Sequence, residues 1–207
     1  MNINNKTLFI TQFGALLAIE AVFCFTPLGQ IPIGVIVATL AAIPIVVTAL
    51  LLGTKAGSLM GAFAGLFSFM VWTFQPPNPF VAFAFTPFVK VGEFSGNFGS
   101  ILICFVPRIL VGTVTGAVYG LMKKLKKSND ILRYAVSAAL GSLTNTVGVL
   151  GGIWLFFGEQ YSTVVGATII YIVGFLTLTN GLPEAVVSAI IAPAVCKPVQ
   201  IVLKKRG

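Results

Sequence analysis

The chain has 207 residues, of which 57% are hydrophobic and 9% are charged, and its mean hydropathy is +1.01. A soluble domain carries about 25% charged residues, so this composition excludes a soluble fold and indicates a polytopic integral membrane protein. The length suits a single membrane domain, residues 1–207, with about six spanning helices of roughly 20 residues each. Continuous rather than alternating apolar stretches argue against a β-barrel.

The formal net charge of +8 does not indicate nucleic acid, because the basic residues lie between apolar stretches and at the chain ends, as topology signals do. The chain has no histidine, and Cys24, Cys104 and Cys196 lie in apolar contexts without a CxxC spacing. These features argue against metal, haem and histidine-based catalytic sites, and we expect no cofactor. Without a Walker motif, the chain is not expected to hydrolyse ATP itself.

Apolar runs and the turn residues between them predict the spans. The first run ends before Pro27, the second at Gly53 and the third at a QPPNP turn, and a loop rich in Phe, Pro and Gly follows. Pro183 and Glu184 suit the first turn of the last helix. The N-terminal run lacks an Ala-x-Ala cleavage site and is interpreted as a first helix. The predicted spans are residues 7–25, 34–52, 56–74, 101–122, 131–157 and 182–203.

The charges predict cytoplasmic N- and C-termini, because only Lys90 and Arg108 then fall on or near the outside. Residues 162–179 are apolar and long enough to span, but a seventh span would put the basic tail outside. We therefore expect them to form an outer lid or re-entrant segment. The cytoplasmic basic residues would be Lys6, Lys55, Lys123, Lys124, Lys126, Lys127, Arg133, Lys197, Lys204, Lys205 and Arg206.

Four polar residues from four predicted helices converge at one depth. At a rise of 1.5 Å per residue, Glu20, Arg108, Asn145 and Glu184 all fall near the outer ends of their helices. Polar and ionisable residues inside membranes are expensive and often functional. The pattern predicts a polar cavity near the outer face that is covered by loops.

Each of these residues has a structural interpretation as well as a ligand-binding one. The planar fork of Arg108 suits a carboxylate or phosphate, but it also suits an ion pair with Glu20 or Glu184. Glu184 fits a helix cap, Asn145 fits a contact between helices, and Glu20 fits an interfacial position. These alternatives stay open at this point.

Helical spacing sorts the neighbouring polar and aromatic residues. Ser142, Asn145 and Thr146 share one helix face and are expected to line the cavity. Trp72 is either a membrane-belt aromatic, as Trp154 is expected to be, or a ligand contact. Phe74 belongs with Phe80, Phe83 and Phe85, which suit loop packing or a hydrophobic lid.

Small residues recur on two predicted helices. Gly14, Ala15 and Ala18 lie on the first, and Gly57, Gly61 and Gly65 recur every four residues on the third. Small residues let helix backbones approach closely. The pattern indicates either packing inside the bundle or a docking face for another membrane protein.

Three stretches resemble a known family. They are IPIGVIVATLAAIPIVVTALLLGTKAGSLMGAFAGL (31–66), PRILVGTVTGAVYGLMKK (107–124), and SLTNTVGVLGGIWLFFG with NGLPEAVVSAI (142–158 and 180–190). With these, the chain resembles the S components of energy-coupling factor (ECF) transporters, which capture vitamins for uptake, and in particular the pantothenate-type members. The resemblance covers nearly the whole chain.

The resemblance implies a six-helix bundle in the bacterial cell membrane with an outward cavity and no enzymatic activity of its own. Uptake would need a transmembrane coupling protein (T component) and two ATPases, and capture would be followed by tilting of the bundle. Docking would use helices 1 to 3, where Gly14, Ala15, Ala18, Gly57 and Gly61 are the candidates. The family's Ala-x-x-x-Ala pattern on helix 1 is met here only in residue size, by Gly14 and Ala18, because Ala15 is followed four residues later by Ile19.

For a pantothenate-type member, Arg108 would bind the carboxylate and Asn145 the amide. Thr146 and Glu184 would bind hydroxyl groups, with Ser142, Trp72 and Phe74 as further candidates. The alternative ligands on the same scaffold are a pyridoxine-type compound, a thiamine precursor, cobalamin, folate or riboflavin. Alternatives of another class are an intramembrane enzyme with a Glu20–Glu184 pair and a purely structural membrane protein.

Overall fold

The computed structural model describes residues 5–33, 36–124 and 129–206, and their structure is mostly helical. Within this part, five helical stretches are long and apolar enough to cross a membrane, and α2 is a shorter apolar helix. The chain is thus an all-α membrane protein. The α-helices are α1 (Asn5–Phe25), α2 (Ala42–Leu52), α3 (Thr54–Phe74), α4 (Phe98–Lys124), α5 (Asp130–Val165), α6 (Ile169–Leu176) and α7 (Leu182–Arg206).

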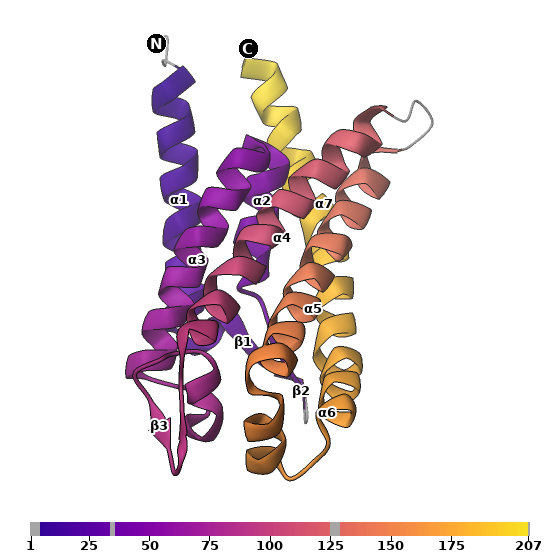
Figure 1. Cartoon of the computed structure of the whole chain (residues 1–207). Coiled ribbons are helices and arrows are strands. Elements are labelled where there is room, and N and C mark those ends of the chain that lie inside the picture. Colours follow the sequence, from indigo (N-terminus) through magenta and orange to yellow (C-terminus); the bar gives the residue numbers. More distant parts are fainter. Residues whose placement is uncertain (1–4, 34–35, 125–128, 207) are drawn as a thin grey trace.

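Short elements connect these helices. An antiparallel hairpin joins α1 to α2, and a second small hairpin follows a 3-10 helix in the loop between α3 and α4. Figure 1 shows both chain ends at one end of the bundle, with the second hairpin and α6 toward the opposite end. The short elements are η1 (Pro27–Gly29), β1 (Gln30–Ile33), β2 (Ile36–Thr39), η2 (Pro79–Ala84), β3 (Lys90–Val91), β4 (Phe94–Ser95) and the π-helical η3 (Thr177–Gly181).

The predicted second span is wrong at its start. Its first residue, Gly34, lies outside the described residues, as do Lys126 and Lys127, but β2 occupies Ile36–Thr39 and α2 begins only at Ala42. The segment IPIGVIVAT is rich in β-branched residues, which favour extended backbone, and Pro32 and Gly34 disfavour a helix. Apolarity alone did not distinguish a short hairpin from a helix here.

The C-terminal boundaries also differ from the prediction. α5 runs on to Val165, with a kink at Phe157, and ends at Gly166 in the left-handed conformation. After this turn, α6 passes through the π-helical turn η3 into α7, so the last helix does not begin at 182. In the wider π turn, the N–H of Leu182 donates to the carbonyl of Thr177, five residues earlier. The next residue, Pro183, has no N–H and cannot continue this pattern.

The glycine stripe of α3 lies inside the bundle. Gly57, Gly61 and Gly65 are buried, and a Cβ atom at Gly61 would overlap the carbonyl oxygen of Arg108 on α4. On the α4 side, a Cβ atom at Gly112 would overlap the backbone of Gly57. The prediction that Gly57 and Gly61 belong to an external docking face is therefore wrong, because these glycines let α3 and α4 pack backbone to backbone.

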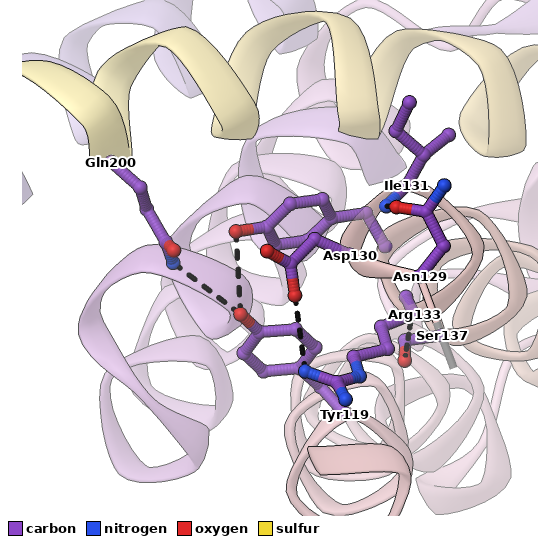
Figure 2. Close-up of polar contacts among 8 residues, drawn as sticks. Tyr119, Asn129, Asp130, Ile131, Arg133, Ser137 and Gln200 are labelled. Atoms are coloured by element: carbon purple, nitrogen blue, oxygen red, sulfur yellow. Dashed lines mark hydrogen bonds and ion pairs between the residues drawn. The ribbon is translucent and has the colours of Figure 1, made fainter. Parts of the chain in front are cut away.

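The end of the bundle near the termini is held by a polar cluster. Tyr119 of α4 donates to the hydroxyl of Tyr134 on α5 at 3.3 Å, and Gln200 of α7 donates to Tyr119 at 3.5 Å. Figure 2 shows this contact beside the Arg133–Asp130 ion pair, whose N–O distance is 3.0 Å. These contacts connect α4, α5 and α7 at that end.

Candidate ligand-binding cavity

A cavity of about 310 Å³ lies between two hydrophobic clusters of the bundle. The cluster toward the termini contributes Ile45 and Val111 to its wall, and the cluster under the second hairpin contributes Phe85 and Ile153. Its other lining residues come from all seven α-helices and from the segments that connect them. Most of the wall is apolar, and a few polar side chains interrupt it, as is usual for small-molecule sites.

Arg108 lines this cavity and is held in position by its own helix. Pro107 has no N–H, so the carbonyl of Ile103, four residues earlier, loses its usual helical partner. The guanidinium of Arg108 donates to that carbonyl at 2.7 Å, and it also donates to Ser68 of α3 at 3.4 Å. With no ion pair to any described carboxylate, the guanidinium is a preorganised cation for an anionic ligand.

Glu20 lines the cavity from α1, and its side chain is fully buried. Its Oε1 atom accepts a hydrogen bond from the Cys24 thiol at 3.3 Å, whereas Oε2 has no hydrogen-bond partner among the described residues. Arg108 lines the same cavity, and no ion pair joins it to Glu20 among the described residues. The structure thus brings Glu20 into the site rather than to an interfacial position.

The polar residues of α5 divide between the cavity and the bundle interior. Asn145 and Thr146 line the cavity, and the Oδ1 atom of Asn145 has no hydrogen-bond partner in the described part of the chain. Thr146 packs closely against Gly181 of η3. Ser142, one turn away, is fully buried and does not line the cavity. Of the three residues predicted to share a cavity-facing side of this helix, only Asn145 and Thr146 therefore line the cavity.

The α6–α7 helix closes the opposite side of the cavity. Glu184, which is 8% exposed, lines it together with Asn180 and Leu176. Asn180, Ser68 and Tyr161 are polar lining residues that were absent from the predicted set. Asn180 could have been found as an asparagine in an apolar segment, and Ser68 by its helical spacing from Trp72 on α3.

Aromatic residues and the loop between α3 and α4 cover the site. Trp72 lines the cavity and stacks on Phe85 with ring centroids 4.2 Å apart. Cys104 of α4 donates to the carbonyl of Phe85 at 3.0 Å, which anchors the loop over the site. Phe74 is 76% exposed and lies outside the lining, and Trp154 is 61% exposed, as expected for a belt aromatic.

The candidate docking residues of α1 lie on an exposed face. Gly14, Ala15 and Ala18 are exposed, and nothing lies within 4 Å of a Cβ atom built at Gly14. The small-residue pattern of α1 thus faces away from the bundle, in contrast to the buried stripe of α3.

A mutation of Asn145 separates a ligand contact from a contact between helices. Because Oδ1 has no described partner, we expect Asn145→Ala to leave the melting temperature of the ligand-free protein unchanged. Loss of a hydrogen bond worth about 0.5–1.5 kcal/mol should weaken ligand binding by roughly 2- to 12-fold. Thermal unfolding and ligand titration measure the two effects. A lower melting temperature with unchanged affinity would instead assign Asn145 to helix packing.

Taken together, apolar spanning helices around a cavity with one guanidinium and several acceptors define a membrane protein that binds a small polar solute. The family model described as "ECF transporter, substrate-specific component" matches residues 8–196. The chain therefore belongs to the substrate-specific components of ECF transporters, and it is a substrate-binding subunit rather than an enzyme.

Two curated relatives narrow the comparison. The chain is 34% identical over 158 residues to the pantothenic acid transporter PanT of Lactococcus lactis subsp. cremoris, covering 76% of this chain and 74% of that protein. It is 29% identical over 163 residues to the pantothenate transporter PanT of Leuconostoc mesenteroides subsp. mesenteroides, covering 71% and 68%.

Proposed function

We propose that the chain captures pantothenate at the outer face of the bacterial cytoplasmic membrane for ATP-driven uptake. The observation that carries this proposal is the Arg108 guanidinium, which lines an otherwise mostly apolar cavity without an ion pair to any described carboxylate. Pantothenate supplies the matching carboxylate, together with an amide and two hydroxyls. Both relatives described above carry names that include this vitamin or its acid.

In this proposal each polar lining residue binds a different group of the ligand. Arg108 binds the carboxylate with charge-assisted hydrogen bonds. Asn145 binds the amide, because its side chain has both donor and acceptor groups. Thr146 and Glu184 bind hydroxyls, and Trp72 covers the apolar carbons of the ligand. Their shared position around one cavity supports these roles.

The proposed topology is a single membrane domain of six spanning helices with cytoplasmic termini. Both chain ends lie at the same end of the bundle (Figure 1), and α4 ends there with Lys123 and Lys124. Basic residues at this end favour the cytoplasmic side. α2 then serves as the sixth, shorter span. Residues 162–179, which were expected to form a separate outer lid, instead include the end of α5 and the α6 part of the last helix, and they lie at the cavity end.

The proposed partners are a transmembrane coupling protein and two ATPase subunits, which supply the energy for uptake. The exposed small residues Gly14, Ala15 and Ala18 of α1 support docking of the coupling protein on this face, where it can approach closely.

Tryptophan fluorescence tests the ligand and its location together. Titration of the purified protein with pantothenate should give a saturable change carried by Trp72, which lines the cavity, and not by the exposed Trp154. We expect Trp72→Phe to lose the signal and Trp154→Phe to keep it, while native mass spectrometry detects one bound ligand in each variant. A chain that binds no pantothenate by either method would contradict the proposed function.

A further inference from the structure

Glu20 is a buried polar group that the packing of the protein does not explain. Its side chain has no exposed surface, yet Oε2 lacks a hydrogen-bond partner among the described residues. Buried polar groups in folded proteins are nearly always hydrogen-bonded, and an unpaired one lowers stability. A role in holding the bundle together would require a partner that the described part of the chain does not supply.

The position of Glu20 indicates what such a partner would be. Glu20 lines the cavity together with Asn145, whose Oδ1 atom also lacks a described partner. A carboxylate oxygen and an amide oxygen are both acceptors, so two acceptors of the cavity lining lack donors among the described residues. The neighbouring Cys24 thiol already donates to Oε1 and leaves Oε2 available.

We propose that Glu20 determines the specificity of the site, because its Oε2 atom accepts a hydrogen bond from a hydroxyl group of the bound ligand. This inference rests on the proposed function, in which the ligand is pantothenate. The ligand carboxylate has no hydrogen to donate to Oε2, whereas the Arg108 guanidinium has donors for it. Arg108 and Glu20 thereby bind different groups of the ligand and orient it.

A buried acceptor of this kind selects strongly between ligands. A site built to hydrogen-bond a hydroxyl rejects an analogue that lacks it, because the buried acceptor is then left unpaired. Glu20 would thus make the protein reject branched acyl-β-alanine compounds that share the carboxylate and amide of pantothenate but lack a hydroxyl.

The test compares ligand preference in the wild-type protein and in Glu20→Ala. The probes are pantothenate and its two analogues, one without the secondary hydroxyl and one without the primary hydroxyl. We expect wild-type protein to prefer pantothenate at least tenfold over one of these analogues, and Glu20→Ala to reduce that preference to less than threefold. Isothermal titration or native mass spectrometry measures the dissociation constants.

Two variants serve as controls. Thr48→Ala removes another fully buried polar side chain, whose hydroxyl donates to the carbonyl of Pro44. Thr48 does not line the cavity, so the preference for pantothenate over each of the two analogues should persist. Glu20→Gln keeps the size of the side chain but replaces one carboxyl oxygen by an NH₂ donor, so it should also lose part of the preference. Glu20→Ala also removes the acceptor of the Cys24 thiol and a buried side chain, so its melting temperature must be measured alongside, whereas Glu20→Gln keeps the side-chain volume and an acceptor.

The outcomes are distinguishable. If Glu20→Ala and Glu20→Gln keep the wild-type preferences over both analogues, the inference is wrong and pantothenate capture still stands. The same holds if both variants melt well below wild type with unchanged preferences, since Glu20 would then be structural. If wild-type protein binds no pantothenate, the proposed function fails, and the role of Glu20 fails with it.

Discussion

Replacing Arg108 by alanine is expected to weaken pantothenate binding by roughly 30-fold or more. The guanidinium lines the cavity and has no ion pair with a described carboxylate, so the ligand carboxylate is its charged partner in the bound state. Truncating one member of a buried, hydrogen-bonded charge pair costs about 2–5 kcal/mol, and 2 kcal/mol corresponds to about 30-fold in the dissociation constant. Titration of the purified variant measures the effect.

Two further variants isolate the charge. Arg108→Lys keeps the charge but loses the planar fork, so it should retain only part of the affinity. Arg133→Ala removes an arginine that pairs with Asp130 and does not line the cavity, and it should leave the ligand affinity unchanged. Arg108→Ala also removes the bond to the carbonyl of Ile103, so its melting temperature must be measured alongside. An affinity within about twofold of wild type would contradict the carboxylate role.

Replacing Gly61 by alanine is expected to destabilise the isolated protein by about 1–3 kcal/mol. The new Cβ atom would overlap the carbonyl oxygen of Arg108, so α3 and α4 would have to move apart. Because the same backbone carries the guanidinium of Arg108, ligand affinity should fall as well. Thermal unfolding in detergent and ligand titration measure the two losses.

Gly14→Ala is the matched control for this prediction. Nothing lies within 4 Å of its added Cβ atom, and alanine is favoured over glycine inside a helix by roughly 0.5–1 kcal/mol, so stability should rise or stay constant. Copurification with the coupling protein should depend on α1, where a larger residue at Gly14 would hinder docking. If Gly61→Ala melted like wild type, internal packing of α3 against α4 would be refuted.

Much of the candidate site could be predicted from residue spacing. Glu20, Arg108, Asn145 and Glu184 lie far apart in sequence, yet all four line one cavity. The prediction succeeded because an α-helix advances by a constant rise per residue, so depth along a spanning helix follows from counting. Residue type then identified which positions at that depth were too polar for lipid.

Other parts of the site depended on how helices rotate and pack. Ser142 and Phe74 have suitable depth and chemistry, but one is buried between helices and the other is exposed. The spacing of the α3 glycines was compatible with a docking face for another protein and with packing inside the bundle, because small residues permit close approach of any neighbouring helix. Ser68 was missed because a hydroxyl can bond the backbone of its own helix and then needs no ligand. Asn180 was missed because it falls between the expected lid segment and the predicted start of the last helix.

The sequence by itself determined that this chain is a polytopic membrane protein, which family it resembles, and which polar residues share one depth. Composition, charge distribution and helical rise are properties of the chain and do not depend on packing. Only the tertiary structure decided that residues 36–39 form a strand, that Gly61 faces α4, and that Glu20 lines the cavity with its Oε2 atom unpaired among the described residues. These features depend on helix rotation and on contacts between distant segments, which local periodicity does not encode.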